Sequence, residues 1–278
     1  MKKIIAAIDG LKYSESAAMY AVQLAKLSNA HLIGIFLDDF TYHSYKIYDL
    51  IASEGVPSQK AAVLEKNDRK VRTESVKKFE AECHKAGLSY SIHHDRSIAI
   101  QELLHESIYA DLLIIDKKET LTSYTEKIPT RFIRDLLGDV QCPVLLVPKK
   151  YKPINKVVLL FDGAPSSVYA IKMFSYLLSS LKVPQLEVFS VKSEDQTMHL
   201  PDNKLMKEFM KQHFQEVEYH VALGNTEEEI WNHLKSLESP LIVLGAYHRG
   251  RLSRWLKESM ADFLMKNLNA PLFIAHNK

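Results

Sequence analysis

The sequence predicts an α/β protein made of two doubly wound parallel-sheet domains in tandem. Two observations lead to this prediction. The chain repeats its own pattern of segments, and its strand-like runs are apolar without alternation, as expected for strands buried on both faces of a parallel sheet. Helical segments separate these runs, and right-handed crossovers would place the helices on both faces of each sheet. The length of 278 residues also suits two domains.

The repeat is clearest at the start of each half. Residues 4–10 read Ile-Ile-Ala-Ala-Ile-Asp-Gly and residues 157–163 read Val-Val-Leu-Leu-Phe-Asp-Gly, which places Asp9 and Asp162 153 positions apart. Later segments match at an offset of 129, as residues 111–116 do with 240–245. We therefore expect domains over residues 1–150 and 151–278. The segment 148–153, three lysines and a tyrosine between two prolines, has the composition of an exposed boundary.

The first half also contains an insertion. The offset falls from 153 to 129, so this half holds 24 additional residues, and the segment Thr41–Asn67 is the best candidate. Tyr42, Tyr45 and Tyr48 are spaced by three, which is helical spacing. We expect this insertion to leave the sheet unextended and to cover or flank the ligand edge of the first domain.

Composition excludes several classes of protein. Lys and Arg number 36 against 34 for Asp and Glu, so a general nucleic-acid footprint is absent. No apolar run approaches the roughly 18 to 20 residues of a membrane span, and the start of the chain is a poor secretory signal. Two cysteines, Cys83 and Cys142, support neither a disulfide framework nor a cysteine-based zinc site. The sequence predicts a cytoplasmic protein with both cysteines buried.

The order of these segments resembles the universal stress protein family in its tandem form, over nearly the whole chain apart from 41–67. Two strands end in Asp-Gly, Gly224 and Asn225 lead into an acidic helix, and residues 241–254 resemble the family's glycine-rich loop. The resemblance implies Rossmann-like domains and a role in the stress response. It implies that the two halves pair through their last strands as an intramolecular pseudo-dimer, and it is compatible with a homodimer. The cofactor that it implies is ATP or another adenine nucleotide.

ATP-binding members of this family share a loop of Gly, two residues, Gly, nine residues, Gly, then Ser or Thr. Glycines allow backbone N–H groups to approach phosphates, and a helix N-terminus favours anions. In the second half, Gly245 and Ser259 match the first and last positions. His248 and Glu258 replace the second and third glycines. We therefore expect a degenerate nucleotide loop that binds weakly, with Glu258 repelling phosphate.

The same loop region differs between the halves in charge and in glycine content. In the second half we expect Gly250, which lies nearby, to compensate in part for the missing glycines, and we expect Arg249 and Arg251 either to bind an anion or to form a solvated face or a set of interface ion pairs. In the first half the stretch from Asp116 to Thr130 contains no glycine. Because backbone N–H groups cannot converge on an anion without the backbone conformation that glycine supplies, we expect no nucleotide binding there.

Candidate nucleotide-binding residues therefore lie in the second half: Asp162, Gly163, Gly224, Gly245, Arg249, Gly250, Arg251 and Ser259. Asp162, like Asp9, follows a strand at the edge where open α/β sheets bind ligands, although an aspartate there also caps the next helix. We find no catalytic motif and no metal-ligand spacing. The leading hypothesis is a non-catalytic stress-response protein, and the alternatives are a ligand-free interaction scaffold and a slow ATP hydrolase.

Overall fold

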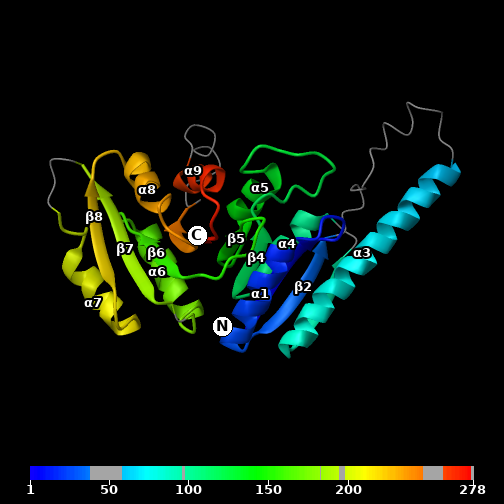
Figure 1. The fold of residues 1–278 in the computed structure, drawn as a ribbon, viewed down its shortest axis with the longest axis horizontal. Coiled ribbons are helices and arrows are strands. Elements are labelled where there is room, and N and C mark those ends of the chain that lie inside the picture. The colour runs from blue at the N-terminus through cyan, green and yellow to red at the C-terminus, as the bar shows by residue number, and fades with distance from the viewer. Residues whose placement is uncertain (38–57, 96–97, 182, 194–197, 247–258, 277–278) are drawn as a thin grey trace.

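The computed structural model describes residues 1–37, 58–95, 98–181, 183–193, 198–246 and 259–276 (Figure 1). The first half contains, in chain order, β1 (Lys3–Asp9), α1 (Glu15–Ser28), β2 (His31–Leu37), α3 (Ser58–Ala86), β3 (Tyr90–Asp95), α4 (Ala99–Ser107), β4 (Leu112–Asp116), α5 (Arg131–Asp139) and β5 (Val144–Val147). The second half contains β6 (Lys156–Leu160), α6 (Pro165–Leu177), β7 (Gln185–Lys192), α7 (Asn203–His213), β8 (Glu218–Leu223), α8 (Thr226–Leu234), β9 (Pro240–Gly245), α9 (Met260–Asn267) and β10 (Leu272–Ala275). Strands and helices alternate in both halves, as the repeat predicts.

The strands form one continuous ten-stranded sheet with the order β3-β2-β1-β4-β5-β10-β9-β6-β7-β8. The two halves have the same strand order, read outward from the centre, and every strand pair within a half is parallel. At the centre β5 and β10 pair antiparallel, with Leu145 opposite Phe273. The predicted common topology and the predicted pairing through the last strands are both confirmed.

Helices cover both faces of this sheet because the strands are apolar on both faces. In β1, the even-numbered Ile4, Ala6 and Ile8 belong to one core cluster, and Ile5 and Ala7 belong to the other. The first cluster includes residues of α1, α3, α6 and α7, and the second includes residues of α4, α5, α8 and α9. Cys83 and Cys142 are both buried, as predicted. The described helices include none long and apolar enough to span a membrane.

Part of the predicted insertion belongs to a helix. Residues 58–67 form the first turns of α3, a helix of 29 residues, so Asn67 is not the end of a separate segment. Tyr42, Tyr45 and Tyr48 lie outside the described residues. The described part adds no strand, because β2 pairs directly with β3. The Ser75 hydroxyl donates to the carbonyl of Gly10 at 2.8 Å, so α3 flanks the carboxyl edge of the first half (Figure 1).

A buried lysine joins the two halves at the centre of the sheet. Lys117 follows β4 and is 3% exposed, and its ammonium donates to the carbonyls of Met265 at 3.1 Å and Leu268 at 2.5 Å. These carbonyls lie at the C-terminal end of α9, where a helix lacks internal donors and favours a cation. Burial lowers the pKa of Lys117 to about 8, helped by Lys118 and opposed by Asp116.

We predict that Lys117→Met destabilises the protein by about 1 to 3 kcal/mol, because two buried carbonyls lose their charged donor. The neighbouring Lys118 is exposed, so Lys118→Met is the matched control and should cost less than about 0.5 kcal/mol. Urea denaturation at pH 7 measures both. Equal stability of the two variants would contradict a structural role for Lys117.

Candidate functional site

The candidate site lies at the carboxyl ends of the central strands, where open α/β sheets bind ligands. Asp9 is the last residue of β1 and Asp162 lies just after β6, at matching positions of the repeat, but their environments differ. Asp9 is fully buried and its carboxylate accepts from the Leu11 N–H at 2.7 Å. Asp162 is exposed and its carboxylate accepts from the Ala164 N–H at 2.9 Å and from the Ser167 hydroxyl at 2.6 Å. Each carboxylate stabilises the turn that follows its strand, because it accepts from the N–H group two residues later. Nucleotide contact by Asp162 stays a prediction.

In the first half, a glutamate occupies the place that the family's loop gives to its second glycine. Glu119 corresponds to His248 at the offset of 129 and is only 7% exposed. Its carboxylate accepts from the N–H groups of Thr120 at 2.8 Å and Leu121 at 2.9 Å. The hydroxyl of Thr130, the counterpart of Ser259, donates to the Glu119 carbonyl. The loop therefore binds a carboxylate of its own chain.

This arrangement corrects one argument made from the sequence. We expected that N–H groups could not converge on an anion without glycine, yet those of Thr120 and Leu121 converge on a carboxyl oxygen of Glu119 in a segment without glycine. Leu121 takes the required backbone conformation itself, with φ of 48°. The missing glycines thus do not prevent two N–H groups from converging on one oxygen atom, and the first half differs because these N–H groups are already occupied by Glu119.

Carboxyl groups gather at this edge of the first half. The pKa of Glu119 is raised to about 8, chiefly by burial and also by the nearby charges of Asp9 and Asp116, while the Leu121 and Thr120 N–H groups act to lower it. Asp116 accepts from the Ser14 hydroxyl at 3.0 Å and from the Lys118 N–H at 2.9 Å. A phosphate placed here would meet three acidic groups whose hydrogen bonds are already made within the chain.

In the second half, Gly245 permits close packing against a helix. A side-chain carbon there would lie 2.3 Å from the carbonyl oxygen of Ser166 and 2.8 Å from the amide nitrogen of Ser167. The contact arises because α6 begins early, at Pro165. In the first half α1 begins at Glu15, which corresponds to residue 168 at the offset of 153, so α1 begins about one turn later than α6. The first half thus has room for the Asp116 side chain. The structure gives Gly245 a packing role, and its contact with a nucleotide stays a prediction.

Two more of the predicted glycines, Gly163 and Gly224, have positive φ angles that favour glycine. Gly163 has φ of 83°, and a side-chain carbon there would lie 2.7 Å from the Cβ of Pro201. Gly224 has φ of 136° and lies against Glu229 in the acidic first turn of α8. Asp162, Gly163 and Gly245 gather at one part of the edge. Gly224 follows β8, two strands from β6, and is not brought to them.

Ser259 lies at the start of α9, as the loop pattern predicts. Its hydroxyl accepts from the Asp262 N–H at 3.1 Å, and the Asp262 carboxylate accepts from the Ser259 N–H at 3.5 Å, which is a capping box. Arg249, Gly250 and Arg251 lie outside the described residues, as do His248 and Glu258. Within the described ranges, no cluster of His, Cys, Asp or Glu could hold a metal ion.

Comparison with known sequences decides the family. The model of the universal stress protein family matches residues 1–148, which is more than half of the chain. The chain belongs to the universal stress protein family. No curated protein matches the sequence.

Two solved universal stress proteins show the same fold over nearly the whole chain. A universal stress protein from Archaeoglobus fulgidus is 15% identical, with a TM-score of 0.68 over 99% of this chain and 98% of that chain. A putative universal stress protein from Pseudomonas aeruginosa is 18% identical, with a TM-score of 0.56 over 99% of this chain and 92% of that chain. At these identities the likeness concerns the fold alone, and it spans both halves.

Proposed function

We propose that this member of the family is a non-catalytic, cytoplasmic stress-response protein that binds an adenine nucleotide weakly in its second half. The observation that carries this proposal is the contrast between the two sheet edges. The first half holds the buried Asp9 and Glu119 at its edge, whereas the corresponding Asp162 of the second half is exposed. An exposed carboxylate beside Gly163 can accept hydrogen bonds from a ribose or an adenine.

Occupation of the first edge by carboxyl groups supports an unequal pair of domains, over residues 1–150 and 151–278. In the first half, Glu119 takes the N–H groups of Thr120 and Leu121, and Glu126 takes the Arg131 N–H at 2.7 Å at the start of α5. These are the groups that a phosphate would need. Binding there would require both glutamates to leave.

The proposal predicts that full-length protein binds one ATP and that Asp162→Ala weakens this binding about tenfold or more, since a charged hydrogen-bond acceptor is lost. Asp9→Asn is the matched control: it keeps the oxygen that accepts from Leu11 and should leave ATP affinity unchanged. Isothermal titration calorimetry measures both variants. If Asp9→Asn loses ATP binding and Asp162→Ala retains it, the nucleotide site lies in the first half and the proposal is wrong.

One observation favours a second candidate, a ligand-free interaction scaffold. The capping box satisfies the start of α9 from within the chain, through Ser259 and Asp262. A phosphate would have to replace the Asp262 carboxylate at the Ser259 N–H. If the protein is a ligand-free scaffold, the same titration of the wild-type protein with ATP should give no heat of binding.

A further inference from the structure

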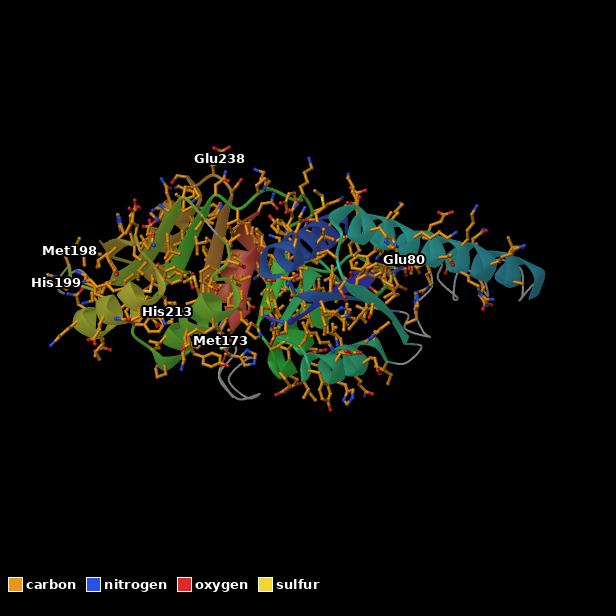
Figure 2. The ribbon with its side chains drawn as sticks, turned by 90° about the horizontal axis from the view of Figure 1, so that it is seen from below. Glu80, Met173, Met198, His199, His213 and Glu238 are labelled. Carbon is orange, nitrogen blue, oxygen red and sulfur yellow. The ribbon has the colours of Figure 1, made fainter. Side chains whose placement is uncertain are left out.

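A pocket separate from the candidate nucleotide edge lies at the outer end of the second half. It has a volume of about 340 Å³ and is formed by residues 198–200, the first turns of α7, and the edge strand β8. Figure 2 shows Met198 and His199 at this end of the molecule, far from the β5–β10 junction. The volume falls within the range of pockets that hold small molecules.

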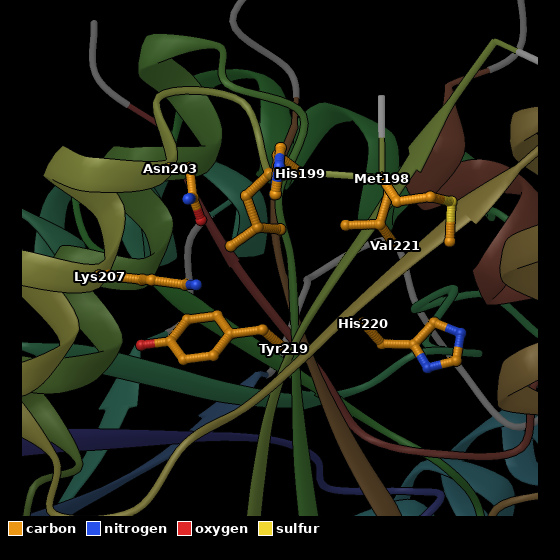
Figure 3. A pocket seen from close by; sticks show the side chains of 8 residues that line it. Met198, His199, Asn203, Lys207, Tyr219, His220 and Val221 are labelled. Atoms are coloured by element: carbon orange, nitrogen blue, oxygen red, sulfur yellow. The ribbon is translucent and has the colours of Figure 1, made fainter. Parts of the chain in front are cut away.

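The polar groups on one side of this pocket include a lysine ammonium and a side-chain amide. Lys207 and Asn203 come from consecutive turns of α7, and their polar ends face each other beside the ring of Tyr219 (Figure 3). The Lys207 ammonium lies 5.3 Å from the centre of that ring. His199 adds an imidazole to the lining. None of the described residues that line the pocket carries a carboxylate.

The helix that supplies these donors begins without an internal cap. Asp202 precedes α7 with φ of 42° and its side chain caps no N–H group, and the first turn contains no acidic residue. The N–H groups at this end of the helix, next to Asn203, therefore donate no hydrogen bond to the Asp202 side chain, although its carboxylate lies at the same end. The preference of the pocket for an anion rests on Lys207.

Apolar groups form the rest of the lining. Leu200 and Val221 are buried beneath the donors, and Met198 is exposed beside them. Tyr219 and His220 leave β8 in opposite directions, so the imidazole of His220 points away from Lys207 (Figure 3). A ligand that fits must therefore join an anionic group, held by Lys207 and Asn203, to a flat apolar body that lies on Tyr219 and Leu200.

We propose that this pocket binds a small organic anion, a phosphate or carboxylate attached to an aromatic or similar apolar group, independently of the nucleotide edge. Pro201, which follows the lining residue Leu200 in the chain, lies close to Gly163 at that edge. The two sites are nevertheless distinct, since Asp162 and Gly245 do not line the pocket.

The test is a ligand-observed NMR titration of the full-length protein with phenyl phosphate, phenylacetate, benzyl alcohol and benzylamine. We expect the two anions to bind and the neutral and cationic probes to bind at least about tenfold more weakly, since only an anion gains from Lys207. The relative affinity of the two anions distinguishes a phosphate ligand from a carboxylate.

Two variants locate the binding. Lys207→Gln should weaken the anions about tenfold or more, whereas Lys211→Gln, an exposed lysine on the same helix outside the pocket, should change their affinity less than twofold. Asp162→Ala should leave phenyl phosphate binding intact even if it abolishes ATP binding. Equal effects of the two lysine variants, competition by ATP, or no binding of either anion would each overturn the proposal.

Discussion

Replacing Gly245 by alanine is expected to destabilise the second half by about 3 kcal/mol, because the new methyl group would lie against backbone atoms that cannot move aside. The closest atoms, at 2.3 and 2.4 Å, are the carbonyl oxygen and carbon of Ser166 in the first turn of α6. Relief would require α6 to shift away from β9, although the two elements share one core cluster. Urea denaturation measures the loss.

Gly10→Ala is the control for this variant. Its added carbon would meet only the flexible side chain of Arg72, at 3.1 Å, and its backbone is outside the left-handed region. We expect a cost below about 1 kcal/mol. If Gly245→Ala costs no more than Gly10→Ala, the packing role of Gly245 is wrong, and the glycine is explained by ligand approach instead.

The second large effect is the pH dependence that Glu119 gives to the free energy of unfolding. Its folded pKa of about 8 lies above the ordinary value of 4.5, so the folded chain holds a proton that the unfolded chain releases between these values. The stability linked to this group is complete below pH 4.5 and is lost as the pH rises to about 8. The expected loss across this window is roughly 4 kcal/mol.

Glu119→Gln should remove this dependence, because the amide oxygen can still accept from Thr120 and Leu121 but cannot ionise. We expect the variant to be more stable than wild type at pH 8 and to lose that advantage near pH 5. Glu126→Gln, in the same loop but exposed, should follow the wild-type curve. Chemical denaturation between pH 5 and 8 tests this, and parallel curves for all three proteins would refute a neutral, buried Glu119.

The sequence was sufficient to predict the topology because the fold depends on repeated local patterns. Apolar runs such as Ile4–Ile8 and Val157–Phe161 recur at fixed offsets, and each helix between them supplies its own apolar stripe. Because the strands of the two halves match in sequence pattern, corresponding strands are expected to have corresponding neighbours in the sheet. The central β5–β10 pair was predicted from the family's habit of pairing at its last strands, and the structure places Leu145 opposite Phe273.

The chemistry of the edges was harder to predict, because it depends on groups that meet only in three dimensions. A glutamate in a loop is ordinarily solvated, and Glu119 was not among the predicted site residues; the one signal in the sequence was its alignment with the second glycine position, opposite His248. Lys117 reaches carbonyls 148 and 151 residues away, which no local pattern shows. The outer pocket combines Lys207 with Tyr219 from a neighbouring strand, and neither residue belongs to a motif.

The central claim is that nucleotide binding in this universal stress protein is confined to the second half. Photolabelling of the full-length protein with 8-azido-ATP, followed by peptide mass spectrometry, tests this most directly. We predict that labelled peptides come only from residues 156–278 and that excess ATP prevents the labelling. Labelled peptides from residues 1–147 would contradict the claim, and an absence of ATP-protected labelling in both halves would replace it with the ligand-free scaffold.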